Sequence, residues 1–373
     1  MKLLICATQF KGGSLQVVIS LINEFRKHPE NEYHVIVSES VSRQVDTTTF
    51  PPNYHFYEYP YSGPTTFSSK TARSKFFASI EERASPDCVV TTSGPLYWHA
   101  KVPVLMGFNL PNNIYEDSPF FKMVTFRKRF KWWFKKQIHR YYFRRDATAY
   151  FVQTDDVNQR LRKYIGRDEV YTVSNTCNNF FINRKSFPDK LPEKQPGEIR
   201  MLTVSTWYPH KNFEIINPVL KELEKRGLSN IRFVLTLKKE HYDRIFGEEY
   251  TDKVVNVGPV PAAECPSLYE ECDYMFLPTL LECFSASYAE AMIMEKPILT
   301  SNLGFATVVC KDAAVYFDAI NPIDIADKIE RLVTNPALQR ELIEKGKKQL
   351  SQFGTAEDRA NQILELCRKI TKK

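Results

Sequence analysis

The sequence of 373 residues contains no apolar run of about 18 residues, the length that a helix needs to cross a bilayer. Nor does it begin like a secretory signal, because the apolar stretch in MKLLICATQFKGG is short and leads into glycines and a helix. We therefore expect a cytoplasmic protein without a membrane-spanning helix. Internal repeats and low-complexity tracts are also missing.

Closely spaced cysteines are missing as well. The eight cysteines are scattered between Cys6 and Cys367, and they form no CxxC pair and no Cys/His cluster. In a chain without an export signal, such cysteines are expected to be reduced thiols in the core rather than disulfides or zinc ligands.

Strand-like apolar runs alternate with helix-length amphipathic segments along the whole chain. The expected strands lie at 2–8, 32–38, 54–60, 86–92, 102–108, 149–154, 170–175, 199–206, 231–237, 254–260, 273–279, 296–302 and 314–319. Apolar runs separated by helices are typical of parallel sheets covered on both faces. The sequence therefore predicts an α/β protein with two doubly wound domains, whose ligands bind beyond the carboxyl ends of the strands.

A segment rich in proline and charge, at residues 187–198, separates the two series of strands and has almost nothing to bury. We predict an N-terminal domain over residues 1–180, a linker over 181–198, a C-terminal domain over 199–354 and a final helix over 355–373.

The stretch LLECFSASYAEAM places two acids, Glu282 and Glu290, eight residues apart just after a strand that Pro278 closes. The spacing predicts a helix over 285–294. The first amides of such a helix and its dipole form a site for phosphate, and Ser285 can cap the helix or contact the same phosphate. Glu282 can reach a ligand on one side of that phosphate, and Glu290 on the other. A sugar nucleotide has this layout.

This pattern resembles the E-x7-E motif of the retaining family 4 glycosyltransferases. The resemblance implies the GT-B fold, in which two Rossmann-like domains face each other across a cleft and the C-terminal helices pack back toward the N-terminal domain. It also implies a UDP- or GDP-sugar donor, which is a substrate rather than a cofactor, and no metal. Glu282 would position the sugar hydroxyls, and Glu290 would bind the ribose.

Further site residues follow from the same resemblance. Lys211, at the start of a helix, would pair with the diphosphate as a catalytic cation, and Thr206 stands where the family usually carries an arginine. Gly258 and Val260 would lie near the nucleobase. The remaining donor-side residues are Phe284, Ser285, Ala286, Gly12 and Gly13. On the acceptor side the family's usual histidine is absent, and Asn109 and His99 are the candidates.

The stretch FKMVTFRKRFKWWFKKQIHRYYFRRD, residues 121–146, carries ten Lys or Arg and no acid before Asp146. Interleaved aromatic residues suit a helix in an anionic membrane interface or on a lipid-linked acceptor. Nucleic acid or an ordinary half-buried helix would account for the same composition. The membrane-facing residues would be Lys128, Arg129, Lys131, Trp132, Trp133, Lys135 and Lys136.

We therefore expect a retaining glycosyltransferase that uses a lipid-linked glycan acceptor in lipopolysaccharide, capsule or glycolipid assembly, in peripheral contact with the inner face of the membrane and without nucleic acid. Two alternatives remain open. One is a sugar-nucleotide epimerase of GT-B architecture, and the other is a nucleic-acid or membrane-surface binding protein built around residues 121–146.

Overall fold

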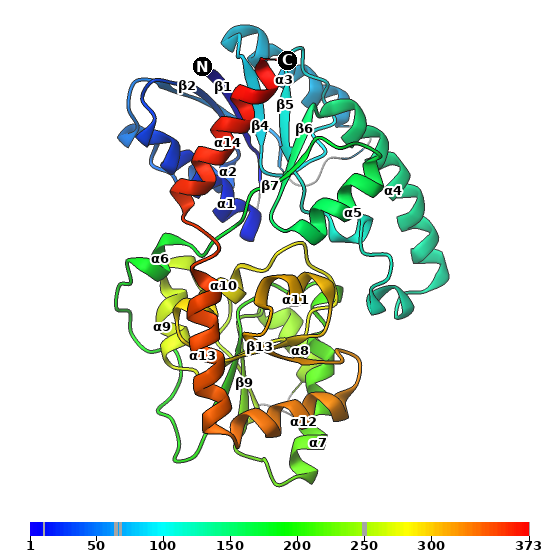
Figure 1. The fold of residues 1–373 in the computed structure, drawn as a ribbon, viewed down its shortest axis with the longest axis vertical. Coiled ribbons are helices and arrows are strands. Elements are labelled where there is room, and N and C mark those ends of the chain that lie inside the picture. The colour runs from blue at the N-terminus through cyan, green and yellow to red at the C-terminus, as the bar shows by residue number, and fades with distance from the viewer. Residues whose placement is uncertain (10–11, 63–65, 67–68, 248–251, 373) are drawn as a thin grey trace. The chain divides into compact units, whose positions relative to one another are not determined.

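The computed structural model describes residues 1–9, 12–62, 66, 69–247 and 252–372. The chain forms two compact units, each with its own parallel sheet (Figure 1). Unit 1 comprises residues 1–115, 124–175 and 355–373, and unit 2 comprises 116–123 and 176–354. The polypeptide therefore changes unit four times, at residues 115/116, 123/124, 175/176 and 354/355.

The sheet of unit 1 has seven strands in the order β3-β2-β1-β4-β5-β6-β7. Their bounds are β1 Lys2–Ala7, β2 Glu32–Val37, β3 Tyr54–Glu58, β4 Cys88–Thr91, β5 Val104–Gly107, β6 Ala149–Val152 and β7 Val170–Thr172. All neighbours are parallel, and the central strands are buried on both faces, which explains their continuous apolar sequences.

Helices cover both faces of this sheet. They are α1 Gly13–Glu24, η1 Phe25–Lys27, α2 Glu39–Ser42, η2 Thr47–Thr49, α3 Lys70–Ala84, η3 Pro111–Asn113, α4 Phe126–Asp146, α5 Asp155–Ile165 and α14 Ala356–Thr371. Local sequence fixes several ends. Thr154 caps α5 through Val157 N, and Thr355 with Asp358 forms a capping box at the start of α14.

The sheet of unit 2 has six parallel strands in the order β10-β9-β8-β11-β12-β13. Their bounds are β8 Ile199–Thr203, β9 Ile231–Leu235, β10 Val254–Asn256, β11 Tyr274–Leu277, β12 Ile298–Ser301 and β13 Ala314–Phe317. All thirteen strands expected from the sequence are therefore present.

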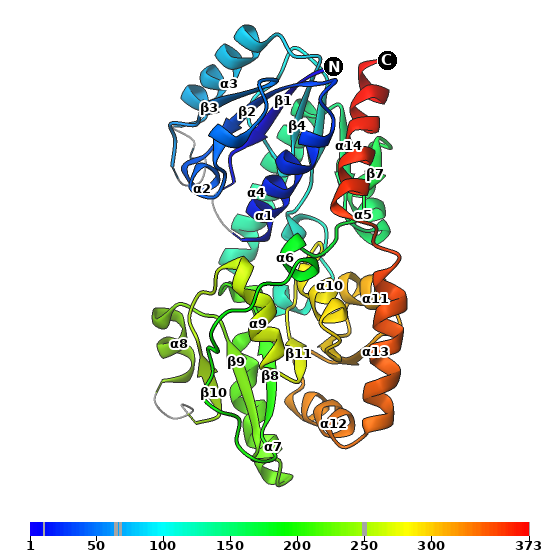
Figure 2. The same ribbon diagram turned by 90° about the vertical axis from the view of Figure 1, so that its left-hand side faces the viewer.

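Twelve helices belong to unit 2 among the described residues. They are η4 Pro119–Lys122, α6 Asn179–Ile182, η5 Pro209–Lys211, η6 Phe213–Ile215, α7 Ile216–Lys225, α8 Lys239–Phe246, η7 Ala262–Glu264, α9 Cys265–Glu270, α10 Ala286–Ile293, α11 Gly304–Cys310, α12 Pro322–Val333 and α13 Pro336–Leu350. Helix α13 packs beside α10, as Figure 2 shows.

The last helix, α14, returns to unit 1 and lies next to α1 (Figure 1). Its apolar side is part of the core of that unit, with Ile363, Leu364 and Cys367 almost inaccessible to solvent. Arg359 of the same helix is buried and donates to Asn175 and Ser20. The expected return of the C-terminal end to the N-terminal domain is thus confirmed.

The segment 187–198, which the sequence suggested as a linker, lies within unit 2. The carboxylate of Glu271 accepts hydrogen bonds from the backbone amides of Lys190 and Leu191, and Lys194 pairs with Asp273 at 2.6 Å. These contacts attach the segment to the residues between α9 and β11.

No helix among the described residues is both long enough and apolar enough to cross a membrane. All eight cysteines are buried, and none of them forms a disulfide.

Candidate functional site

In unit 2 the strand order reverses direction between β8 and β11, which is where ligands of doubly wound sheets bind. The loop after β8 carries Lys211, and the loop after β11 carries Glu282. The carboxyl ends of parallel neighbours meet at the same edge of a sheet, so the topology brings these two loops together.

The two loops are joined by their backbones. Leu280 N donates to the carbonyl of His210 at 2.7 Å, and the hydroxyl of Thr279 donates to the same carbonyl at 3.2 Å. Asn212 stands in the left-handed region with φ 59°, and its side-chain amide donates to the carbonyls of Pro278 and Ala319. These bonds fix the backbone on both sides of Lys211.

Lys211 Nζ forms an ion pair with Glu282 Oε1. The two side chains are only 13% and 14% exposed, so each charge depends on the other for compensation. A diphosphate that enters here would compete with Glu282 for the ammonium group. Such competition would free the carboxylate to face hydroxyl groups of the same ligand.

His210 precedes this lysine and is kept uncharged. Burial first, and the neighbouring charge of Lys211 second, lower the pKa of His210 to about 4. Its ring packs between Tyr208 and Phe120. The neutral imidazole therefore packs against these two aromatic rings.

A short segment from the N-terminal half of the chain supports this site, and the sequence analysis did not predict it. Residues 116–123 belong to unit 2, although the residues on either side belong to unit 1. The buried hydroxyl of Ser118 donates to the carbonyl of Leu280 at 2.7 Å, two residues before Glu282. We call residues 116–123 the clasp. It leads directly into α4, the basic aromatic helix.

Helix α10 begins at Ala286, four residues after Glu282. Ser285 is its N-cap in an extended conformation, and its hydroxyl makes no cap bond within the protein. The first amides of a helix have no partner within the helix, and Ala286 begins this turn. Phe284 packs edge-on against Phe353. The start of α10 therefore offers amides and a hydroxyl beside the Lys211–Glu282 pair.

Glu290 has different surroundings from Glu282. It lies in the second turn of α10, where the hydroxyl of Tyr269 donates to Oε2 at 3.4 Å. Burial raises the pKa of Glu290 to about 7, and the bond from Tyr269 only partly offsets this effect. Glu282 is thus paired with the cation Lys211, whereas Glu290 has the neutral partner Tyr269 and changes charge near neutral pH.

The remaining predicted residues of unit 2 lie at the same edge of the sheet. Thr206 is exposed after β8, with its carbonyl accepting from Ser205. Gly258, at φ 77°, and Val260 follow β10, which lies two strand positions from β8. Two strand spacings are about 10 Å, so these residues lie apart from Lys211 along the edge.

Unit 1 has its own reversal of strand order, between β1 and β4. Gly12, with φ 72°, caps α1 after β1, and Gly13 is the first residue of that helix. The buried Gln9 donates to the hydroxyls of Thr92 and Ser93, both at 3.0 Å, while its Oε1 has no hydrogen-bond partner. Sequence reasoning missed Gln9, although it precedes Gly12 by three residues.

The two acceptor-side candidates are not brought together. Asn109 follows β5 at the carboxyl edge of the sheet. His99 precedes β5, and its ring bonds with the carbonyl of Arg145 at 2.9 Å, just before β6 begins. It therefore lies near the amino edge, away from Asn109.

Helix α4 exposes aromatic residues at the spacing of one helix face. Phe126 is 80% exposed, and Phe130, Trp133 and Phe134 are 56% exposed or more. Of the predicted membrane-facing residues, Lys128, Arg129, Lys131, Trp133 and Lys135 are exposed, whereas Trp132 and Lys136 are half-buried. The exposed aromatic face is thus flanked by basic side chains.

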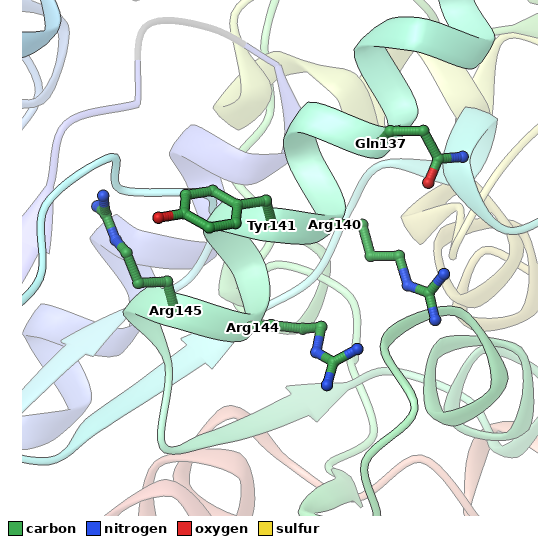
Figure 3. Close-up of a pocket in the computed structure, with 5 residues that line it drawn as sticks. All are labelled: Gln137, Arg140, Tyr141, Arg144 and Arg145. Carbon is green, nitrogen blue, oxygen red and sulfur yellow. The ribbon is translucent and has the colours of Figure 1, made fainter.

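A pocket of about 490 Å³ lies along the C-terminal half of α4 and is lined by Gln137, Arg140, Tyr141, Arg144 and Arg145. Figure 3 shows Arg140 and Arg144 pointing to one side of the helix and Tyr141 and Arg145 to the other. The surface is strongly basic at this end as well.

A family model matches the part of the chain that carries this site. Residues 184–349 match the family described as Glycosyl transferases group 1. This match includes Lys211, Glu282 and Glu290.

Solved structures resemble the whole chain at low sequence identity. The sucrose-phosphate synthase of Thermosynechococcus elongatus has a TM-score of 0.75 and 14% identity, with 100% of this chain and 99% of that chain covered. HepE of Anabaena, solved with UDP and glucose, has a TM-score of 0.70 and 14% identity, with 98% of each chain covered. WaaG, a glycosyltransferase involved in lipopolysaccharide biosynthesis, has a TM-score of 0.72 and 12% identity, with both chains fully covered. The expected GT-B fold is confirmed.

The clasp generates a prediction about the loop of Glu282. Ser118→Ala removes the donor to the carbonyl of Leu280, and a buried polar group left without its partner costs about 1–3 kcal/mol. We expect amide hydrogen exchange in residues 279–285 to become at least about fivefold faster, because a loss of about 1 kcal/mol raises the population of the locally open form about fivefold. Ser79→Ala, which removes an exposed bond within α3, is the matched control. Unchanged exchange in Ser118→Ala would show that the clasp does not hold the loop.

Proposed function

We propose that this chain is a retaining GT-B glycosyltransferase whose match to the group 1 family covers residues 184–349. It transfers the sugar of a nucleoside-diphosphate sugar to a lipid-linked glycan acceptor. The observation that carries the proposal is the Lys211–Glu282 pair at the β8/β11 switch point, beside the start of α10. The cation and the helix amides suit the diphosphate, and the carboxylate suits the sugar.

The leaving group explains why these residues stand together. Negative charge develops on the diphosphate in the transition state, and preorganised donors stabilise that charge most effectively where water is excluded. Lys211 and the first amides of α10 supply such donors. They can balance the charge without a metal, so we propose that none is required.

Each carboxylate would take a separate part of the donor. Once Lys211 turns to the diphosphate, Glu282 accepts hydrogen bonds from the sugar hydroxyls. Glu290 accepts hydrogen bonds from the ribose. An oxygen of the departing diphosphate then takes the proton of the acceptor hydroxyl on the same face of the sugar, which gives retention. UDP is the first donor base to test, because HepE was solved with UDP and glucose.

The position and the exposed surface of α4 support a lipid-linked acceptor. This helix begins after the loop that follows β5 at the carboxyl edge and ends at the amino end of β6, so its aromatic half lies on the ligand-binding side of unit 1. Exposed aromatic rings and lysines suit the headgroup region of an anionic membrane, where a lipid-linked acceptor resides. We propose peripheral attachment to the inner face of the membrane in assembly of lipopolysaccharide, capsule or a related glycolipid.

The ion pair gives the test of the reaction. Lys211→Ala is expected to weaken binding of the nucleoside diphosphate about tenfold to a hundredfold, since a hydrogen bond to a charged group contributes about 1.5–3 kcal/mol. Glu282→Gln frees Lys211, so the diphosphate should bind as tightly as to the wild type or more tightly, while sugar transfer slows about a hundredfold or more. Calorimetry with UDP and GDP, and release of free diphosphate in the presence of acceptor, measure the two effects.

Lys194→Ala, which breaks another ion pair of unit 2, is the matched control and should change neither quantity. A failure of the wild type to bind any nucleoside diphosphate would contradict the proposal. Donor epimerised without an acceptor would favour the epimerase instead.

The raised pKa of Glu290 predicts that donor binding depends on pH. Its carboxylate is the better acceptor for ribose hydroxyls, so affinity for the nucleoside diphosphate should rise as pH increases through about 7. The groups that face Glu290 are Tyr269, Cys177 and Cys265, and burial raises the pKa of each thiol and of the phenol, so all stay neutral in this range.

Calorimetry at pH 5.5–8.5 checks this dependence against Glu290→Gln, in which the residue cannot titrate. Titration of the ligand is common to both proteins, so the ratio of the two affinities isolates Glu290. The raised pKa also means that protonation favours the folded state, so wild-type stability relative to the variant should fall between pH 4.5 and about 7. A ratio of affinities that stays constant with pH would show that Glu290 does not bind the ribose.

Attachment to the membrane is tested on α4. Each lysine near an anionic surface contributes about 1 kcal/mol, so Gln at Lys128, Lys131 and Lys135 together should weaken binding to vesicles of phosphatidylglycerol about a hundredfold. Gln at Lys345, Lys347 and Lys348 of α13 removes the same charge elsewhere and should leave vesicle binding intact. Equal loss in both variants would mean that the net charge, rather than α4, binds the lipid. Oligonucleotide binding lost only in the α4 variant would favour nucleic acid.

A further inference from the structure

Three side chains that can bind metal ions converge at the outer edge of the sheet of unit 1, far along the chain from the transferase residues. Glu32 and His34 lie two residues apart in β2, and His55 lies in the edge strand β3. His34 pairs directly with His55 in the strand register. Because side chains alternate along a strand, Glu32 and His34 project from the same face of β2.

The three ligand atoms have the spacing of a coordination site. Nε2 of His34 and Nε2 of His55 lie 3.0 Å and 3.3 Å from the same oxygen, Oε1 of Glu32. All three atoms lie within 4.8 Å of one another. Zinc bonds of about 2.0–2.1 Å at tetrahedral angles place neighbouring ligand atoms about 3.4 Å apart. Only small side-chain adjustments are needed to hold an ion between them.

A fourth side chain orients one of the ligands. The hydroxyl of Tyr57 bonds with Nδ1 of His34 at 2.8 Å. A histidine that binds a metal through one nitrogen commonly donates its other N–H to such a partner, which fixes the ring and its tautomer. The rings of His34 and His55 are stacked, with centroids 4.7 Å apart, so both present the same nitrogen to Glu32.

Glu32 supplies the one carboxylate among the three ligands, and its two oxygens have separate partners. Lys2 lies 3.7 Å from the other oxygen, Oε2, and leaves Oε1 to the imidazoles. His55 and Glu32 are 45% and 40% exposed, so water can occupy a fourth position.

We propose that Glu32, His34 and His55 bind one divalent transition-metal ion of the Zn²⁺ class, with water as the fourth ligand. Two imidazoles and a carboxylate form a donor set that zinc prefers over the harder Mg²⁺ and Ca²⁺. The ion joins the edge strand β3 to β2. Since Glu32 begins β2, the site lies at the amino edge of the sheet, opposite the β1/β4 switch point, and it is independent of the proposed sugar transfer.

The experiment uses the full chain, free of any affinity tag and treated with chelator, and titrates it with ZnCl₂ against a chromophoric zinc indicator. We expect one ion per chain and a rise in the melting temperature with added zinc, because an ion that binds only the folded state stabilises it. His55→Ala should lose at least about tenfold in affinity, and Tyr57→Phe, which keeps all three ligands, about 10–100-fold.

His28→Ala is the matched control, since His28 lies 3.7 Å from Glu30 and no third ligand joins them among the described residues. This variant should bind zinc as the wild type does. His55 is exposed, so its replacement is compatible with folding, and circular dichroism checks this. A wild type without a zinc site, or equal zinc affinity in the wild type, His55→Ala and Tyr57→Phe, would overturn the proposal. All eight cysteines are buried in the folded chain and do not compete for the ion.

Discussion

The ion pair between Lys211 and Glu282 is the interaction on which the rest of the site depends. Neither charge is well hydrated, so breaking the pair without a replacement is costly. In the proposed reaction, an anionic ligand would supply that replacement for Lys211, and hydroxyl groups would supply it for Glu282. The unliganded protein thus keeps both residues in place through their mutual attraction, and a ligand that carries an anion beside a polyol satisfies both at once. The hydrogen bonds between the two loops confine this exchange to side chains.

Much of the fold could be predicted because its information is local. Each buried parallel strand is a continuous apolar run, and each helix carries its own spacing and caps, as Thr154 does for α5. The pairing of Lys211 with Glu282 was within reach for a similar reason, since both follow strands that a doubly wound sheet places side by side. Family resemblance added the roles, which the strand pattern alone does not contain.

Other parts of the site were out of reach because they depend on tertiary contacts. Nothing in the composition of residues 116–123 marks Ser118 as the donor to the carbonyl of Leu280, which lies 162 residues further on. The convergence of Glu32, His34 and His55 requires the β2–β3 register, which no single strand specifies. The segment 187–198, rich in proline and charge, was interpreted as a linker from its composition. Its polar groups nevertheless bond with residues of unit 2.

The order of segments along the chain has a consequence for biosynthesis. Unit 1 needs α14, whose Ile363, Leu364 and Cys367 lie in its core, and this helix leaves the ribosome after the whole of unit 2. Synthesis of unit 1 therefore begins first and is completed last. One side of its core stays uncovered while some 180 residues of unit 2 are made. During that interval the uncovered apolar core of unit 1 is a surface through which the nascent chain can aggregate.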